Sequence, residues 1–265
     1  MNENDRVSFS MRGHVGVVAM QDASRYNALA PAQVRAVLAA VERSRQAGAR
    51  ALLIASGVKH FCAGADIEEM LKGGSLRPET PRQPGMATPI TLFRTLVEDP
   101  RPVLCLVDGL AMGGGVELVL SCDLCIATPA ARFMLPELGL GVLPRTALLR
   151  LPELVGRRRA LDLILSRRKL SCDEALAMGL VNRQVPQEGA LDAALAWAND
   201  IVSAPPGALA AVKRNLGRIA PDDWDGLHGL LGQMVPAEWE EGFGAFLEKR
   251  TPDYEPFWQA AGKRE

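Results

Sequence analysis

The sequence predicts an α/β protein, and three patterns support this fold class. Short apolar runs bounded by Gly, Pro or Asp recur along the chain, which is typical of buried strands. Segments with apolar residues at helical spacing separate these runs. A strand, a glycine turn and a helix start also follow one another twice, around Gly64 and around Gly114. Strands that alternate with helices up to about residue 185 indicate an α/β architecture.

The elements can be predicted in order from their boundaries and periodicity. Val7 to Met20 alternates and is interrupted by Arg12-Gly13-His14, which predicts a hairpin. Pro31 suits the first turn of a helix that Gly48 terminates. Ser171 with Glu174 predicts a capping box. The expected helices are Pro31–Gln46, Ile90–Val97, Val116–Leu120, Ala147–Val155, Arg157–Leu165 and Cys172–Met178, and the further strands are Arg50–Ser56, Val103–Val107, Leu124–Thr128, Arg132–Leu135 and Leu180–Val185.

Two segments differ from this alternation. Gly73 to Thr88 is rich in Gly, Pro and charge, which predicts a mobile loop. From Leu191 onward the pattern is helical and is broken by Ala204-Pro205-Pro206-Gly207. We therefore expect a core domain of residues 1–200 and a helical C-terminal region of residues 201–265.

Composition limits the classes of partner. The chain of 265 residues is 48% hydrophobic and carries a net charge of −1, so a basic surface for nucleic acid or anionic membrane is not expected. Its first five residues are polar and acidic, unlike a secretory signal, and no apolar run reaches the roughly 20 residues that span a bilayer. We expect a cytoplasmic protein without nucleic-acid or membrane partners.

The cysteines and histidines do not suggest metal or nucleophilic chemistry. Five cysteines lie in apolar segments and are expected to be buried free thiols, and Cys122-Asp123-Leu124-Cys125 is a lone C-x-x-C without a second pair. Three histidines are present, none of them in a metal-ligand spacing or near a nucleophile motif. Acid–base chemistry must therefore rest on carboxylates and backbone groups.

The stretch Val103–Asp123 organises the candidate chemistry. It places Glu117 in an apolar helix directly after three glycines, and Glu137 lies further along among apolar residues in a turn-rich segment. Two carboxylates can share proton transfers when their environments separate their pKa values. Alternatively, Glu117 is an acid that pairs with the helix dipole and Glu137 is a loop carboxylate. Spacing alone leaves both interpretations open.

The two glycine turns are the second candidate feature. Backbone N–H groups at Ala65 and Gly114 could form an oxyanion hole, which typically stabilises a developing charge by about 3–4 kcal/mol per donor. The alternative is two ordinary tight turns. Gly113-Gly114-Gly115 is not a G-x-G-x-x-G fingerprint and no P-loop lysine follows it, so a dinucleotide or nucleoside triphosphate is disfavoured.

At these residues the chain resembles the enoyl-CoA hydratase/isomerase (crotonase) superfamily, in the same order over nearly the whole chain. The matching motifs are Phe61-Cys62-Ala63-Gly64-Ala65-Asp66-Ile67, Asp108 to Leu118, Cys122-Asp123 and Pro136-Glu137-Leu138-Gly139-Leu140-Gly141, with weaker matches at Tyr26–Leu29, Ala175–Val181 and Phe246–Pro252. The resemblance implies a spiral of ββα units, a helical C-terminal trimerisation region and a homotrimer or homohexamer. It also implies an acyl-CoA thioester substrate and no cofactor, because coenzyme A is part of the substrate.

The resemblance also implies roles for individual residues. Ala65 and Gly114 match the oxyanion-hole positions, and Glu117 and Glu137 match the two carboxylates of hydratases, with Glu137 favoured as the proton donor to Cα. The residues implied in substrate binding are Ala63, Asp66, Ile67 and Glu68 along the coenzyme A path, and Arg25 and Lys249 for its phosphates, with Lys249 reaching from a neighbouring subunit. No metal ligand is implied.

The presence of both acids favours an enoyl-CoA hydratase, with a Δ3,Δ2-enoyl-CoA isomerase as the alternative. One segment departs from the hydratase pattern. Where hydratases usually have a glycine run after Pro144, this chain has Arg145-Thr146-Ala147-Leu148-Leu149-Arg150. Arg145 either faces a carboxylated acyl chain or is exposed to solvent. The same departure motivates a third reading, a catalytically quiet acyl-CoA-binding protein.

Overall fold

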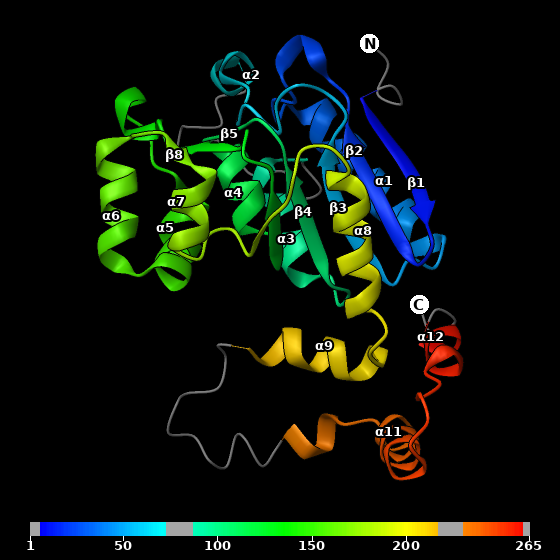
Figure 1. Cartoon of the computed structure of the whole chain (residues 1–265). Helices are drawn as coiled ribbons and strands as arrows, with labels where there is room; N and C mark the ends of the chain where they lie inside the picture. Colours follow the sequence, from blue (N-terminus) through cyan, green and yellow to red (C-terminus); the bar gives the residue numbers. More distant parts are fainter. Residues whose placement is uncertain (1–5, 73–86, 217–229, 262–265) are drawn as a thin grey trace.

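Two β-sheets form the framework of the protein (Figure 1). The computed structural model describes residues 6–72, 87–216 and 230–261. The larger sheet has six strands in the order β1-β2-β3-β4-β6-β9. Its first two strands pair antiparallel as a hairpin and all later neighbours are parallel. These strands are β1 Val7–Arg12, β2 Val15–Met20, β3 Ala51–Ser56, β4 Val103–Val107, β6 Leu124–Ala127 and β9 Arg183–Gln184.

The parallel strands are apolar on both faces because helices cover both sides of the larger sheet. Side chains on a strand alternate between faces, so neighbouring residues enter different cores. Val18 and Ile54 pack with the helices α1 Pro31–Gln46 and α3 Pro89–Glu98, whereas Val17 and Leu53 pack against α8 Ala190–Ile201. All five residues of β4 are buried. The near-continuous apolar runs of these strands follow from this double coverage.

A second sheet of three short strands lies beside the first. Its order is β5-β7-β8, with β5 Leu110–Met112, β7 Arg132–Met134 and β8 Leu170–Ser171. The chain repeats one unit: β4 in the large sheet leads to β5 in the small sheet and then to α4 Gly114–Leu120. The next turn leads in the same way from β6 to β7 and then to α5 Arg145–Val155. This repetition of ββα units is the spiral that the resemblance implies.

Helix boundaries follow recognisable local signals. Pro31 occupies the first turn of α1, and the Thr88 side chain accepts a hydrogen bond from the Thr91 N–H at the start of α3. Ser171 and Glu174 form the predicted capping box of α7. The remaining helices of the core are α2 Ile67–Lys72, α6 Arg157–Ser166 and α7 Cys172–Ala177, with short 3-10 turns η2 at Ala23–Arg25 and η3 at Glu137–Leu140.

The described part of the C-terminal region is helical and lies below the sheets in Figure 1. Its elements are α9 Pro206–Asn215, η4 Leu230–Gln233, α11 Pro236–Glu248 and α12 Glu255–Ala261. Lys213 on α9 ties this region to the core through an ion pair of 2.7 Å with Asp123. Arg50 adds a second tie, with its guanidinium 5.2 Å from the Trp258 ring on α12. The division into domains at residue 200 stays a prediction.

Most predicted elements are present, and the differences concern short strands. β5 and β8 were not expected, because they contain three and two residues and give no periodic signal. The strand expected over Leu180–Val185 is reduced to Arg183–Gln184. The segment Pro136–Gly141 was expected as a loop and contains one 3-10 turn. Residues 73–86 of the expected mobile loop lie outside the described residues. No helix in the described ranges is long and apolar enough to cross a membrane.

Candidate active site

Three turns from different parts of the chain are stacked at one end of the small sheet. Cys62 forms an isolated parallel bridge with Ala111 of β5, and Ala111 pairs in turn with Phe133 of β7. Ala65 and Gly114 each follow the paired residue by three positions, and Glu137 follows Phe133 by four. The spiral therefore brings equivalent positions of three successive units together.

The turns that carry Ala65 and Gly114 pack closely against each other, and their role as an oxyanion hole stays a prediction. A Cβ built on Gly114 would lie 3.2 Å from the Ala65 nitrogen, and one built on Gly64 would lie 3.0 Å from the Gly114 nitrogen. Gly64 has a φ of +92°, which a residue with a side chain rarely adopts. Within the described residues neither amide donates to a protein acceptor. The Gly114 N–H is also one of the unpaired donors at the first turn of α4, where the helix dipole favours negative charge.

Close backbone packing fixes these two turns against each other. Cys62 N–H donates to the Leu110 carbonyl (3.1 Å), and Met112 N–H donates to the Cys62 carbonyl (2.9 Å). A Cβ on Gly115 would lie only 2.3 Å from the Cys62 carbonyl oxygen, so a glycine is required there. The glycines following β5 therefore let α4 begin directly against the turn that carries Ala65.

Asn27 stabilises the segment that leads into the turn carrying Ala65. Its side chain is fully buried and donates to Ser56 Oγ (2.9 Å) and to the carbonyls of His60 (3.2 Å) and Phe61 (3.1 Å). Its Oδ1 accepts from the Asp22 N–H (2.8 Å). Because every polar atom of the amide is used, Asn27 fixes the path of the chain just before Ala65.

Glu117 projects from α4 toward the start of α5. Its Oε1 accepts hydrogen bonds from the backbone N–H groups of Thr146 (2.6 Å) and Ala147 (3.2 Å). Burial raises the pKa of Glu117, while these two N–H donors and the charge of Arg145 oppose that shift. Glu117 is thus a carboxylate whose ionised form is held by the N-terminus of a helix.

Glu137 has a different environment. Burial raises its pKa to about 7, with an opposing contribution from its own backbone N–H and a further increase from the charge of Glu117. Oε2 is buried without a hydrogen-bond partner among the described residues. A Cβ built on Gly113 would lie 2.8 Å from Oε1 of Glu137, so this glycine makes room for the carboxyl group. Glu137 is poised to carry a proton near neutral pH.

The arrangement places two carboxyl groups close to two backbone N–H groups that have no protein acceptor among the described residues. Gly113 contacts the carboxyl group of Glu137, and Gly114 contacts the turn of Ala65. Glu117 lies one helical turn further along α4 and interacts electrostatically with Glu137. Such a set can stabilise negative charge on a carbonyl oxygen while one carboxylate accepts a proton and the other donates one.

The residues predicted to bind coenzyme A around α2 are grouped, and several contact one another. Arg25 forms ion pairs with Asp66 and with Glu68, the latter at 3.8 Å. Asp66 is buried and accepts the Glu69 N–H (3.1 Å) at the start of α2. Ile67 and Glu68 are exposed, and Ala63 and Ala65 are half-buried. The charged side chains of Arg25, Asp66 and Glu68 are therefore engaged with each other, and the apolar side chain of Ile67 is exposed.

Lys249 lies far from the candidate site of its own chain. It caps the C-terminal end of α11 with a φ of 55° and is exposed. In Figure 1, α11 lies at the opposite end of the molecule from α2 and β5. Lys249 therefore does not reach the site of its own chain, which leaves the prediction that it serves a neighbouring subunit.

Arg145 is exposed and begins α5, two residues earlier than the sequence predicts for this helix. No ion pair of Arg145 is present within the described residues. The positive charge of Arg145 lowers the pKa of Glu117 and so opposes the effect of burial. Arg145 therefore favours ionisation of the carboxylate that it neighbours.

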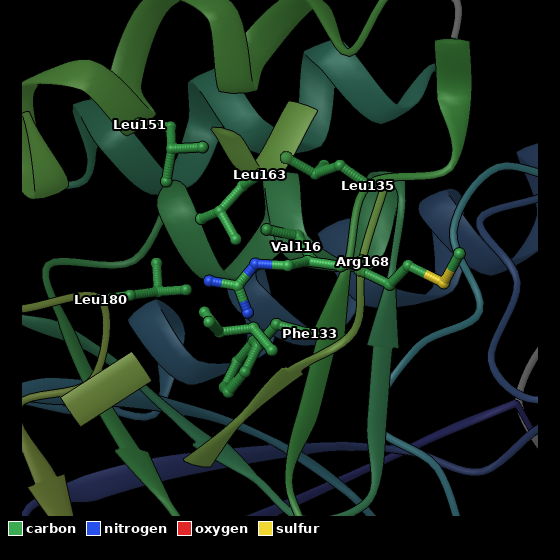
Figure 2. A pocket seen from close by; sticks show the side chains of 9 residues that line it. Val116, Phe133, Leu135, Leu151, Leu163, Arg168 and Leu180 are labelled. Carbon is green, nitrogen blue, oxygen red and sulfur yellow. The ribbon is translucent and has the colours of Figure 1, made fainter. Parts of the chain in front are cut away.

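An apolar crevice beside α4 is lined by residues that lie close in sequence to Glu117 and Glu137 (Figure 2). Val116, adjacent to Glu117, and Leu135, two residues before Glu137, line it together with Leu151 and Leu163. The Arg168 side chain also lines it (Figure 2), and its guanidinium forms ion pairs with Asp162 (3.1 Å) and Glu174 (2.8 Å). The crevice belongs to the apolar packing between α4, α5 and α6.

The buried thiols are chemically quiet. All five cysteines are free and buried, as the sequence predicts. Cys62 lies nearest the site and its thiol contacts the Asn27 carbonyl oxygen at 3.1 Å. Burial raises the pKa of Cys62 to about 12, so its thiolate is not populated near neutral pH. Within the described ranges no group of His, Cys, Asp or Glu side chains is placed to hold a metal ion.

The sequence reasoning missed Asn27 and the two amides that bind Glu117. Asn27 was noted only as part of a weak motif match, and its φ of 57° marks a conformation that Asn tolerates better than most residues. The amides of Thr146 and Ala147 follow Pro144, and a proline before a helix is a start signal. A search for free N–H groups at that helix start would have located the partner of Glu117.

Comparisons with known proteins identify the family of this chain. A sequence model of the enoyl-CoA hydratase/isomerase family matches residues 10–256. A putative enoyl-CoA hydratase of Thermus thermophilus is 32% identical over 92% of this chain and 98% of its own length. A short-chain-enoyl-CoA hydratase of Clostridium acetobutylicum is 34% identical over 94% and 97%, and a mevalonyl-coenzyme A hydratase of Beauveria bassiana is 32% identical over 90% of each chain.

Solved structures support the same assignment. The enoyl-CoA hydratase subunit I of Geobacillus kaustophilus superposes with a TM-score of 0.85 at 32% identity, covering 96% of this chain and 99% of the other. An enoyl-CoA hydratase/isomerase of Cupriavidus metallidurans gives a TM-score of 0.81 at 30% identity, covering 95% and 96%. The predicted crotonase-like fold is confirmed. With the family model spanning residues 10–256, the chain belongs to the enoyl-CoA hydratase/isomerase family.

Proposed function

We propose that the protein is an enoyl-CoA hydratase, which adds water reversibly to a trans-2-enoyl-CoA thioester and gives a 3-hydroxyacyl-CoA. One observation carries the proposal: two carboxyl groups with different environments lie beside two free backbone N–H groups. Hydration across an activated double bond needs a base for water, an acid for carbon and a site for the developing oxyanion. The hydratase names of several relatives add support.

In this proposal the two glutamates have separate roles. Glu117 is ionised, because two N–H donors and Arg145 favour its charged form, and it accepts a proton from the attacking water. The protonated Glu137, whose pKa is raised to about 7, delivers its proton to Cα. The thioester oxygen lies between the N–H groups of Ala65 and Gly114 as the enolate forms. The addition leaves Glu117 protonated and Glu137 ionised, so one proton must pass from Glu117 to Glu137, through water, before the next turnover.

The coenzyme A moiety is proposed to pass along Ala63, Ile67 and the start of α2. The exposed side chain of Ile67 offers apolar surface there, and Arg25 retains a half-exposed guanidinium beside Asp66. Lys249 is proposed to contribute from a neighbouring subunit of a homotrimer or homohexamer. Its distance from the site within one chain supports this requirement for a second copy.

The direct test is hydration of crotonyl-CoA, followed through the ultraviolet absorbance of the conjugated thioester. Glu117→Gln and Glu137→Gln should each lower kcat by about 10²–10⁴, the usual contribution of a positioned acid or base. Glu153→Gln is the matched control, because Glu153 is an exposed glutamate on α5. A loss of less than about tenfold in both active-site variants would contradict the proposal.

A Δ3,Δ2-enoyl-CoA isomerase is the second candidate, and Glu137 favours it. A single carboxyl group with a pKa of about 7 and an unpartnered oxygen can remove a proton from one carbon and return it to another. A 3-enoyl-CoA substrate separates the two reactions. Under isomerisation, Glu137→Gln would abolish turnover whereas Glu117→Gln would retain most of it.

The third alternative is a protein that binds acyl-CoA without catalysis. Turnover of any acyl-CoA in a panel of chain lengths would exclude it.

A further inference from the structure

A polar cleft lies away from the two glutamates, at the start of the small sheet. It has a volume of about 360 Å³. This volume lies within the range of roughly 300–1,000 Å³ that is typical of small-molecule sites. Its polar lining comes from five separate segments of the chain. These residues are Lys59, His60, Asp108, Arg132, Lys169 and Gln187.

The charge in this cleft is unbalanced. Three cationic side chains line it, Lys59, Arg132 and Lys169, against the single carboxylate of Asp108. None of the three cations has an ion pair in the part of the chain that the structure describes. Asp108 instead accepts hydrogen bonds from Thr128 Oγ1 (2.6 Å) and Gln187 Nε2 (3.0 Å). The acid is therefore satisfied by neutral groups, and the cations remain available to a ligand.

Two further groups in the cleft are already oriented by the backbone. Arg132 donates through Nη1 to the carbonyls of Pro129 (2.8 Å) and Ala131 (2.7 Å), which anchors the guanidinium. Its other N–H groups have no acceptor within residues 6–72, 87–216 and 230–261. His60 Nδ1 accepts from the Leu110 N–H at 3.4 Å. With Nδ1 used as an acceptor, the N–H of the ring lies at Nε2, so His60 supplies another donor. Preorganised donors of this kind lower the cost of binding an anion.

The cleft is separate from the position proposed for the thioester oxygen. Leu110 and Arg132 begin β5 and β7, and both line the cleft or its edge. The same two strands end just before Gly113 and Glu137. The two sites therefore lie at opposite ends of the small sheet.

From these observations we propose that the cleft is a second binding site, which takes a phosphate monoester. Three cations against one satisfied carboxylate match a dianion, and a guanidinium with free N–H groups suits phosphate oxygens. The remaining volume accommodates the organic group of the ester. The site does not depend on the hydratase reaction, because none of its residues belongs to the proposed catalytic set.

The test is calorimetric titration of the full chain with inorganic phosphate and with phenyl phosphate in a phosphate-free buffer of low ionic strength. The double variant Lys59→Gln/Lys169→Gln should bind both probes at least about tenfold more weakly, since each lost charge-assisted contact contributes substantially to affinity. The matched control is Arg157→Gln/Arg158→Gln, which removes two positive charges from exposed positions on α6. Equal weakening in both double variants, or no binding by the unmodified chain, overturns the proposal.

The source of the phosphate is resolved by a second pair of titrations. Coenzyme A carries a 3′-phosphate monoester, and dephospho-coenzyme A lacks it. If the cleft variant weakens only coenzyme A, the occupant is the phosphate of the substrate. If the variant weakens the phosphate probes and leaves both coenzymes unchanged, the occupant is a separate phosphate ester. Thermal unfolding of each variant, unchanged within a few degrees, shows that the fold is retained.

Discussion

Gly113 leaves open the space that the carboxyl group of Glu137 occupies, although 24 positions separate the two residues in the chain. A Cβ on Gly113 would lie 2.8 Å from Oε1, closer than a side chain can approach without displacing the acid. The Gly113 N–H donates to the Met134 carbonyl at 2.8 Å, so this backbone cannot move away freely. The turn that carries Gly114, a proposed oxyanion donor, therefore also limits where the carboxyl group of Glu137 can lie.

Gly113→Ala should consequently damage activity more than stability. The added methyl group meets Oε1 of Glu137, and the φ of 55° adds a backbone cost of about 1–3 kcal/mol. We expect kcat for enoyl-CoA hydration to fall at least about tenfold, since misplacing a reacting group is costly. Steady-state kinetics and thermal unfolding measure the two effects.

Gly141→Ala is the control for that substitution. Gly141 also has a positive φ, of 73°, but a Cβ there would have no neighbour within 4 Å. It should lose stability through backbone strain and keep most of its activity. Equal losses of kcat in both alanine variants would mean that strain, and not contact with Glu137, explains the effect.

The protonation of Glu137 predicts a pH dependence of activity. If protonated Glu137 donates its proton to Cα of the substrate, kcat/KM should fall as pH rises through about 7, where this carboxyl group ionises. A lower limb should come from Glu117, which acts as its carboxylate and whose pKa is raised by burial. Crotonyl-CoA hydration measured from pH 5 to 9 at constant ionic strength tests this. A profile that stays level from pH 6 to 8 would exclude Glu137 as the acid.

The same carboxyl group predicts how stability changes with pH. The pKa of Glu137 is raised from 4.5 to about 7 in the folded protein, so the folded state retains a proton that the unfolded state has released. Its contribution is therefore fully present below about pH 4.5 and is lost as pH rises through 7. Relative to the wild type, Glu137→Gln should become progressively more stable over this window. Urea unfolding at pH 5 and pH 8 measures the difference, and a constant difference contradicts it.

The sequence could predict much of this fold because its local signals are strong. Both boundaries of α1 were predicted, since Pro31 marks its start and Gly48 follows its end. β4 was predicted with both boundaries because its apolar run lies between Pro102 and Asp108. β5 and β8 were not predicted because two or three residues are too few to show a hydrophobic periodicity, and these strands form through pairing with distant strands.

The site was only partly predictable for the same reason. The two glycine turns are local features, and their residues were named from the sequence. Their meeting depends on the bridge between Cys62 and Ala111, which joins segments 49 positions apart and leaves no local signal. The unequal environments of Glu117 and Glu137 depend on α5 and on burial, so spacing alone could not assign an acid and a base.

The helix start that binds Glu117 can be tested through its backbone. Thr146→Pro removes the N–H that donates to Oε1 at 2.6 Å, and proline is tolerated in the first turn of a helix. Because this donor favours the ionised form, its loss should raise the pKa of Glu117 further and shift the lower limb of the pH profile upward. Thr146→Ala retains the N–H and should leave that limb in place. The same shift in both variants would attribute it to the lost hydroxyl group.

Asn27 is expected to position the turn that carries Ala65 without contacting the substrate. Asn27→Asp preserves shape and tolerance of a positive φ, but it removes the Nδ2 donor to Ser56, His60 and Phe61 and buries a carboxyl group. We expect a loss of about 2–3 kcal/mol in the free energy of unfolding, because buried acceptors lose their partner. The turn that carries Ala65 should loosen, so kcat falls while KM changes little.

Asn199→Asp is the matched control for Asn27→Asp. Asn199 lies on α8 and donates to the Leu195 carbonyl at 2.9 Å, away from both glycine turns. It should lose a smaller part of its stability and keep kcat. Since both variants convert an amide to a carboxyl group, a drop in kcat confined to Asn27→Asp, measured well below its unfolding temperature, assigns the effect to the turn. An unchanged kcat in that variant would show that the Ala65 amide keeps its position without this amide.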